Sequence, residues 1–320
     1  MNQQKKHPGY LTEFLEINGI KQYMLHYPSQ AKPVVLHLHG GPGQSQAHFA
    51  YCTRPEDDYC TYVFYDQRGA GKTQRRSKTP ASEVTLENLL EDLRLTILHV
   101  KERYATDEVI LLGHSWGSVL GTEYIRRYPS DVRGFIGVGQ VVDIAKGETI
   151  GFAKLTESVE RKGKKSDQKA LAALAGYPNG LEGKSFFKQM GRVRALQSRY
   201  GATVNIPKLL KALLKSPVFH PADLLSLANG LAVNSNLLNS MLEYSILSVT
   251  EYQTPVCYVL GENDWQVPSV LAAEYFEGIH APYKALRLVK DAGHMTDFDN
   301  PRGFHEAVRE CVEQLCAIAQ

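Results

Sequence analysis

Short apolar runs alternate with helical patterns along the first part of the chain. Val34–Leu38 and Thr61–Tyr65 are bounded by turn residues, and such runs are typical of strands that are buried on both faces. Over residues 85–104 the apolar positions recur at close to helical spacing. The alternation continues with strand patterns at 108–112 and 135–138 and a helical pattern at 116–128. Strands and helices in this order predict a parallel sheet with helices on both faces.

A β-hairpin is predicted near the start of the chain. Residues 11–17 and 21–27 are β-rich runs joined by Asn18-Gly19, a dipeptide that favours the tight turn of a two-residue hairpin. Because hairpin strands are antiparallel, the sheet is expected to be mostly, rather than wholly, parallel.

The pattern changes between residues 146 and 250, where no strand is predicted. Leu-, Ala- and Lys-rich segments at helical spacing are separated by prolines, which predicts an all-helical insertion. At Pro255 the earlier alternation resumes, with strands at 256–260 and 285–289 and helices at 270–277 and 303–318. We therefore expect a doubly wound core formed by residues 1–145 and 251–320, with a helical cap formed by residues 146–250.

The charge distribution is consistent with this division. The chain has a formal net charge of +2, but residues 146–250 contain 15 Lys and Arg against 7 Asp and Glu. We interpret the basic run at 161–165 as a solvated helix end, because no aromatic residues interleave with its charges. No nucleic-acid partner is therefore expected.

Composition bears on the compartment and on partners. The five cysteines are an odd number without metal-ligand spacing, so they are predicted to be free thiols in a reducing compartment, and the cytoplasm is expected. The polar N-terminal residues lead into no apolar segment typical of a secretory signal. No stretch approaches the roughly 18 uncharged apolar residues of a membrane span, so no membrane partner is expected.

The strongest chemical signal is Gly113-His114-Ser115-Trp116-Gly117, a match to Gly-x-Ser-x-Gly. It lies directly after a predicted strand and directly before a predicted helix, which is the context that a nucleophile elbow requires. Glycines two positions either side of the serine allow the backbone to make this strained turn. The motif predicts that Ser115 is the nucleophile of an α/β-hydrolase fold with a helical cap inserted.

A serine hydroxyl needs a base and an orienting acid, which follow it in the order acid, then histidine, in this fold. Asp264 follows the predicted strand at 256–260, and His294 lies in the loop after the strand at 285–289. We predict that His294 is the general base and Asp264 the acid. Glu262 is the competing acid, but it lies nearer the end of its strand.

A second glycine-rich segment, His-Gly-Gly-Pro-Gly at residues 39–43, follows the strand that ends at Leu38. Small residues let the backbone approach a bound carbonyl closely. The backbone N–H groups of Gly41 and Trp116 are predicted to form an oxyanion hole. The alternative is a turn that only connects a strand to a helix.

Three motifs together resemble those of the proline iminopeptidases, which are serine aminopeptidases of the α/β-hydrolase fold. They are residues 39–43, Asp-Gln-Arg-Gly-Ala-Gly-Lys-Thr at 66–73 and Gly-His-Ser-Trp-Gly-Ser at 113–118. They cover the first 120 residues, and the contexts of Asp264 and His294 extend the resemblance over the core. The resemblance implies removal of an N-terminal residue, often proline, from short peptides. It also implies that Asp66 and Arg68 brace the sheet edge and are not catalytic.

The resemblance weakens in the predicted cap, where the family uses carboxylates to bind the substrate amine. The family's acidic and aromatic signature is not evident between residues 146 and 250, and the segment is basic. Glu148 and Glu243 are the candidate substrate-binding residues, with Glu157 and Glu160 less favoured. For each of them a solvent-exposed helix residue is the alternative interpretation.

These residues predict acyl transfer through an acyl-enzyme, with a small molecule or short peptide as substrate and with no metal or other cofactor. The main prediction is an aminopeptidase of proline iminopeptidase type. The alternative is a carboxylesterase or small-amide hydrolase that keeps the core but has a changed cap. A ligand-binding pseudo-enzyme is disfavoured because all three triad positions are filled, and a dehalogenase because the elbow carries serine rather than aspartate.

Overall fold

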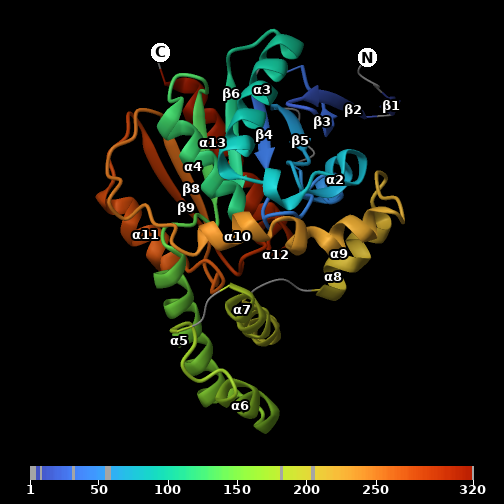
Figure 1. The fold of residues 1–320 in the computed structure, drawn as a ribbon. Coiled ribbons are helices and arrows are strands. Elements are labelled where there is room, and N and C mark those ends of the chain that lie inside the picture. Colours follow the sequence, from blue (N-terminus) through green and yellow to red (C-terminus); the bar gives the residue numbers. More distant parts are fainter. Residues whose placement is uncertain are drawn as a thin grey trace.

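A nine-stranded sheet forms the centre of the computed structural model, which describes residues 5–7, 9–30, 33–54, 59–180, 183–202 and 206–318. The strand order is β1-β2-β3-β5-β4-β6-β7-β8-β9, and helices lie on both sides of the sheet (Figure 1). The strands are β1 (Lys5–His7), β2 (Tyr10–Ile17), β3 (Ile20–Tyr27), β4 (Val34–Leu38), β5 (Thr61–Tyr65), β6 (Val109–His114), β7 (Gly134–Val138), β8 (Val256–Gly261) and β9 (Lys284–Val289).

The sheet is antiparallel at one edge and parallel over the rest. Strands β1, β2 and β3 pair antiparallel, and β3 pairs antiparallel with β5. From β5 through β4, β6, β7 and β8 to β9, every pair is parallel. Ile17 pairs with Ile20 across the turn at Asn18 and Gly19, both of which have positive φ, as a tight hairpin turn requires. The predicted hairpin and the mostly parallel sheet are confirmed.

The two faces of the sheet carry separate apolar clusters, because successive side chains of a strand point to opposite faces. On one face, Leu36 and Leu111 belong to a cluster that includes residues of α3 (Leu86–Tyr104), α4 (Trp116–Arg127) and α11 (Ser269–Gly278). On the other face, Val35 and Leu112 belong to a cluster that includes residues of α13 (Pro301–Ala317). Every residue of β4 to β8 is buried, which explains why these strands have no alternating polar pattern.

Six helices of the described residues lie between β7 and β8, and we call them the helical insertion. They are α5 (Ile144–Lys162), α6 (Lys165–Ala172), α7 (Gly183–Gln197), α8 (Ile206–Lys215), α9 (Asp223–Val233) and α10 (Ser235–Met241). In Figure 1, α5 and α6 extend away from the lower side of the core, while α9 and α10 lie across that side. The helices agree with the helical pattern of this segment, and the division of the chain at residues 146 and 250 stays a prediction.

The two ends of the helical insertion meet at one point of the core. The backbone N–H of Ile144 donates to the carbonyl of Tyr244 at 3.2 Å, and that of Ile246 donates to the carbonyl of Val142 at 2.8 Å. These bonds flank an isolated antiparallel bridge between Asp143 and Ser245. The chain therefore leaves the core and returns to it side by side.

The elements that the sequence pattern missed are the three-residue strand β1 and several short helices. The short helices are α1 (Ala50–Thr53), α2 (Gly71–Ser77) and α12 (Thr296–Asp299), with 3₁₀ turns at Ala81–Glu83 and Ser198–Tyr200. Helices this short carry too few turns to show apolar periodicity. All five cysteines are free, as predicted. Among the helices of the described residues, none combines the length and apolar character needed to cross a membrane.

Candidate active site

Ser115 lies at the sharp turn between β6 and α4, at the carboxyl edge of the parallel strands. Its backbone has φ 54° and ψ −120°, a conformation that non-glycine residues rarely adopt. The residue is buried, and it lines a cavity of about 510 Å³. A strained backbone that presents a serine hydroxyl to a cavity is the arrangement of a nucleophile elbow.

The two glycines of the elbow motif are required by close backbone contacts. A Cβ atom on Gly113 would lie 2.3 Å from the carbonyl oxygen of Gly117. A Cβ atom on Gly117 would lie 2.0 Å from the carbonyl oxygen of Leu38, at the end of the neighbouring strand β4. Both distances are far below van der Waals contact, so the turn closes only with glycine at these positions.

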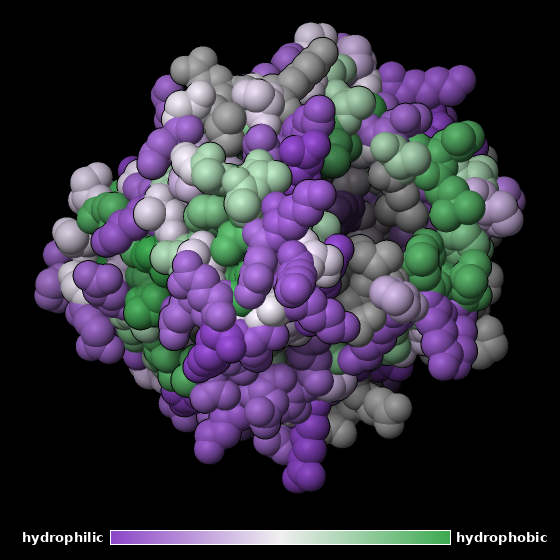
Figure 2. All heavy atoms as spheres, turned by 90° about the horizontal axis from the view of Figure 1, so that it is seen from below, coloured by the Kyte–Doolittle hydropathy of each residue, from purple (hydrophilic) through white to green (hydrophobic). Residues whose placement is uncertain are grey.

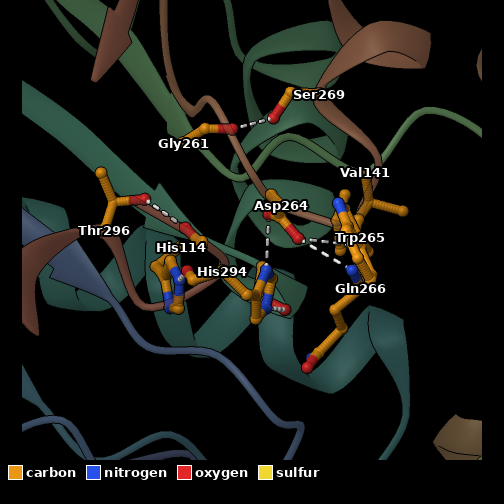
Figure 3. Close-up of polar contacts among 12 residues, drawn as sticks. His114, Val141, Gly261, Asp264, Trp265, Gln266, Ser269, His294 and Thr296 are labelled. Carbon is orange, nitrogen blue, oxygen red and sulfur yellow. Dashed lines mark hydrogen bonds and ion pairs between the residues drawn. The ribbon is translucent and has the colours of Figure 1, made fainter. Parts of the chain in front are cut away.

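The structure brings Ser115, His294 and Asp264 into one hydrogen-bonded row. The Nε2 atom of His294 lies 3.0 Å from the Ser115 hydroxyl oxygen, and its Nδ1 atom lies 2.8 Å from Asp264 Oδ2 (Figure 3). With Nδ1–H donating to the carboxylate, Nε2 carries the lone pair and accepts from the serine hydroxyl. This is the geometry in which a histidine can take the serine proton.

Backbone donors hold the Asp264 carboxylate in place. Its Oδ1 atom accepts from the N–H groups of Gln266 and Val267, both at 2.9 Å, while Oδ2 faces His294. The competing acid, Glu262, is exposed, and its Oε2 atom accepts from the N–H of Asp291 at 3.2 Å. Of the two acids considered from the sequence, Asp264 is therefore the one that contacts the histidine.

The loop that carries His294 is fixed by a second histidine that sequence reasoning did not assign a role. His114, which precedes the serine, lies with its Nε2 atom 2.9 Å from the His294 carbonyl oxygen, and the two rings are 5.0 Å apart. Burial lowers the pKa of His114 to about 4, so its ring is neutral at neutral pH. The Thr296 hydroxyl donates to the Gly293 carbonyl at 3.2 Å, which further constrains the loop (Figure 3).

The glycine-rich segment after β4 packs directly against the elbow. A Cβ atom on Gly40 would lie 3.2 Å from Ser115 Cβ, and Gly41 has φ +118°, which side chains disfavour. Gly41 and Trp116 both line the cavity. Trp116 is the first residue of α4, so its N–H has no acceptor within the helix. The positions fit the predicted oxyanion hole, and the assignment of the two N–H groups stays a prediction.

Gln67, in the Asp-Gln-Arg-Gly motif, joins the elbow to the glycine-rich segment. Its Oε1 atom accepts from the indole N–H of Trp116 at 2.8 Å, and its Nε2 atom donates to the carbonyl of His39 at 3.0 Å. Its backbone N–H donates to His39 Nε2 at 3.0 Å. Gln67 thus positions both segments that were predicted to supply oxyanion donors. Sequence reasoning did not assign it this role, although its place inside the motif at residues 66–73 was a signal that it has one.

Asp66 and Arg68 make structural contacts away from the cavity. The Arg68 guanidinium binds Asp92 on α3 through two hydrogen bonds, at 2.8 and 2.9 Å. Asp66 Oδ2 accepts from the backbone N–H of Lys72 at 2.7 Å. Neither Asp66 nor Arg68 lines the cavity. The contacts agree with the bracing role that the resemblance implies.

The cavity lies between the core and the helical insertion, and its wall is largely apolar. Core residues Ser115, Trp116 and His294 form one side. The helical insertion contributes aromatic and aliphatic side chains, among them Phe186, Phe187, Met190, Leu238 and Met241. A largely apolar wall favours a substrate with an apolar group beside the scissile bond.

One ion pair interrupts the apolar wall. Glu148 on α5 is buried, its Oε2 atom accepts from the Tyr177 hydroxyl at 2.6 Å, and its Oε1 atom contacts the guanidinium of Arg194 on α7. Glu148 and Arg194 both line the cavity. No sequence signal marks this partner, because Arg194 is one of many basic residues in the segment.

The other candidate acids lie elsewhere. Glu243, Glu157 and Glu160 are exposed and do not line the cavity. For these three, the structure supports the alternative interpretation of a solvent-exposed residue. Within the described ranges there is no group of three or more His, Cys, Asp or Glu side chains placed to hold a metal ion.

Comparisons with known proteins agree with the fold and identify relatives. The sequence profile of the serine aminopeptidase S33 family matches residues 29–199. A probable aminopeptidase, YbaC, from Bacillus subtilis is 25% identical over 302 residues, which cover 92% of this chain and 91% of YbaC. A proline iminopeptidase from Saccharolobus solfataricus is 24% identical over 311 residues, 92% of this chain and 90% of its own. The crystal structure of a Mycobacterium smegmatis proline iminopeptidase superposes with a TM-score of 0.66 at 17% identity, covering 95% of this chain and 98% of its own.

Proposed function

The chain belongs to the serine aminopeptidase S33 family, and we propose that it is a serine hydrolase that releases the N-terminal residue of short peptides or amino-acid amides. The observation that carries the proposal is the row of Ser115, His294 and Asp264 beside the cavity, with separations of 3.0 and 2.8 Å. The names of the two relatives support the choice of aminopeptidase over other hydrolases.

The first half of the proposed reaction forms an acyl-enzyme. His294 Nε2 takes the hydroxyl proton as Ser115 Oγ attacks the substrate carbonyl, and Asp264 stabilises the imidazolium that results. The N–H groups of Gly41 and Trp116 donate to the tetrahedral oxyanion. Losing one such donor typically costs about 2.7–4 kcal/mol of transition-state stabilisation. His294 then donates its proton to the departing amine.

In the second half, water attacks the acyl-enzyme with His294 again as the base, and the released acid leaves Ser115 free. His114 and Gln67 do not touch the substrate in this scheme. They position the histidine loop and the oxyanion segment through the hydrogen bonds described above. In this scheme His294 carries each proton between Ser115, the departing amine and the attacking water, with Ser115 Oγ 3.0 Å from its Nε2 atom.

Glu148 is the buried carboxylate of the cavity wall, and we assign it to the substrate ammonium group. Asp143 also lines the cavity, but its Oδ1 atom accepts from the backbone N–H of Lys146 at the start of α5. A carboxylate offers about four acceptor sites, and Tyr177 and Arg194 occupy two of those on Glu148. The remaining sites leave room for an amine donor. Because Glu148 is buried, removing its charge would leave a bound ammonium without a partner, which costs about 2–5 kcal/mol.

A second candidate function is a carboxylesterase or small-amide hydrolase. It is favoured by the guanidinium of Arg194, which already balances the Glu148 charge and would repel a cationic substrate. The largely apolar cavity would suit the acyl group of an uncharged ester equally well.

The experiment that separates the two functions compares matched substrates on the wild type and on Glu148→Gln. For an aminopeptidase, kcat/KM for proline p-nitroanilide should fall by about tenfold or more in the variant, while p-nitrophenyl acetate, which has no amine, should be hydrolysed nearly as before. Acetylation of the substrate amine should reproduce the loss in the wild type.

Glu243→Gln is the matched control, because it removes an exposed carboxylate of the same segment that does not line the cavity. It should leave kcat/KM for the proline substrate unchanged. Equal cleavage of acetylated and free substrates, or turnover of esters alone, would exclude the aminopeptidase and favour the second candidate.

A further inference from the structure

Five leucines on α8 and α9 expose large parts of their side chains to solvent. Their exposed fractions are 52% for Leu210, 72% for Leu214, 49% for Leu224, 69% for Leu225 and 59% for Leu231. We call these five residues the leucine face. Seen from below, a group of apolar residues lies at the right edge of the molecule, on the side where α8 and α9 lie in Figure 1, and further apolar residues lie on the left (Figure 2).

The leucine face follows helical geometry. Leu210 and Leu214 are four residues apart on α8, and Leu224 and Leu231 are seven apart on α9, so each of these pairs lies on one side of its helix. Leu225 lies about 100° around α9 from Leu224 and widens the exposed apolar side. On α8, Leu213 is buried with Phe49 and Phe298, so the core covers only part of the apolar side of that helix. The rest of this wide apolar side faces solvent, which is unusual for a surface helix.

The exposed charges on these two helices are all positive. Lys211 and Lys215 are exposed on α8, between and beside the exposed leucines. The acid of α9, Asp223, is fully buried, and it pairs with Lys72 and Arg75 of α2. An apolar face flanked by lysines, with its acid neutralised inside the protein, is complementary to a surface that is apolar and negatively charged.

The leucine face also adjoins the cavity. Leu231 belongs to the leucine face and lines the cavity, and Leu209, next to Leu210 on α8, lines it too. A partner that covers the leucine face would therefore lie close to the cavity wall.

We propose that the leucine face docks on an anionic lipid surface. The leucines would enter the boundary between head groups and acyl chains, and Lys211 and Lys215 would contact the lipid phosphates. A second copy of the chain is a poorer occupant, because it would bring a second set of these lysines to the interface and neither α8 nor α9 has an exposed acid to balance them. The sequence-based expectation of no membrane partner was drawn from the lack of a spanning segment, and docking on a surface does not need one.

The proposal is tested with the full-length protein and vesicle flotation. Vesicles of phosphatidylcholine alone are compared with vesicles that also contain phosphatidylglycerol, at low and at high salt. Wild-type protein should float with the anionic vesicles only, and less of it should float at high salt. Leu214→Ser with Leu225→Ser should weaken binding by about tenfold or more. Lys211→Gln with Lys215→Gln should weaken it about fivefold for each lysine.

Matched controls carry the same changes on other surfaces. Leu98→Ser removes a leucine that is 52% exposed on α3, and Lys165→Gln with Lys169→Gln removes two exposed charges from α6. Both controls should bind anionic vesicles as the wild type does. All variants should hydrolyse a soluble ester at the wild-type rate, because none of the changed residues lines the cavity, and this shows that they are folded.

Three results would overturn the proposal. The first is wild-type protein that does not float with anionic vesicles. The second is flotation that survives Leu214→Ser with Leu225→Ser, because the leucine face would then not be the contact. The third is a wild-type dimer that becomes monomeric in that variant without any vesicle binding, which would show that a second copy covers the leucine face. Binding is read without turnover, so these outcomes do not depend on the proposed aminopeptidase activity.

Discussion

In an Asp264→Asn variant the new amide has only one orientation that keeps the local hydrogen bonds. The N–H groups of Gln266 and Val267 both donate to Oδ1 at 2.9 Å, so the amide oxygen must stay there. The amide NH₂ then takes the place of Asp264 Oδ2, which lies 2.8 Å from His294 Nδ1 in the wild type. Since NH₂ can only donate, Nδ1 must be the acceptor, and the histidine proton moves to Nε2.

A proton on Nε2 removes the lone pair that accepts from the Ser115 hydroxyl at 3.0 Å. The base is therefore present but in the wrong tautomer, which costs about 10⁴-fold in kcat for a triad of this kind. That factor corresponds to about 5 kcal/mol at 1.36 kcal/mol for each tenfold change. The assay is kcat for p-nitrophenyl acetate and proline p-nitroanilide, measured beside the melting temperature, which should change little.

Glu262→Gln is the control for this prediction, because Glu262 is exposed and contacts the backbone of Asp291 instead of the histidine. It should retain nearly all activity. An Asp264→Asn variant that keeps a tenth or more of wild-type kcat would refute the tautomer argument. A larger loss in Glu262→Gln than in Asp264→Asn would move the role of the acid to Glu262.

Two further predictions concern the nucleophile and a buried acid. Ser115→Ala should lower kcat by several orders of magnitude and abolish labelling by a fluorophosphonate probe, with the melting temperature kept, and residual activity near a tenth would show that another group attacks. Burial raises the pKa of Asp297 to about 7 in the folded protein. As pH rises from about 4 to about 7, Asp297 ionises in the unfolded state but stays protonated in the folded state, so the free energy of unfolding falls. Asp297→Asn cannot ionise, so its melting temperature relative to the wild type should rise between about pH 4 and about pH 7, and a constant difference over this range would contradict the assignment.

The elbow could be predicted from sequence because its chemistry is local. Gly113, Ser115 and Gly117 lie within five residues, and the steric reason for Gly113 lies in the turn itself. The contact that requires Gly117, with Leu38 at the end of β4, is seen only in the structure. The long helices of the core were predictable for a similar reason, since periodicity within one segment reports which face is buried. The buried strands show no periodicity, but each is a short apolar run bounded by turn residues. β4 and β5 have the predicted bounds.

The choice of the triad acid could not be made from position along the chain alone. Glu262 and Asp264 are two residues apart, and sequence order allows both. What separates them is the loop after β8, in which two N–H groups turn the Asp264 carboxylate toward His294. Hydrogen bonds from residues 266 and 267 back to 264 leave no periodic trace in the sequence.

The substrate side of the cavity was the least predictable part. Glu148 was chosen for its place at the start of the helical segment, and the structure does put it in the cavity wall. Its partners Tyr177 and Arg194 are 29 and 46 residues away along the chain, on other parts of the helical insertion. Such pairings depend on how helices pack against one another, and one sequence does not encode them in any local pattern.

The bridge between Asp143 and Ser245 has a consequence for how this protein could be altered. About a hundred residues of the chain lie between Asp143 and Ser245, which are neighbours in the structure. The sheet therefore requires of this segment only that its two ends stay adjacent. Loop-closure entropy grows slowly with length, by about 0.6 kcal/mol for each doubling, so closing a shorter or longer segment there costs nearly the same. What an exchange must keep is the contact of the segment with the core, such as the buried pairing of Asp223 with Lys72. The segment can therefore be exchanged between relatives as a cassette, which would carry a new cavity wall to an unchanged set of reacting groups.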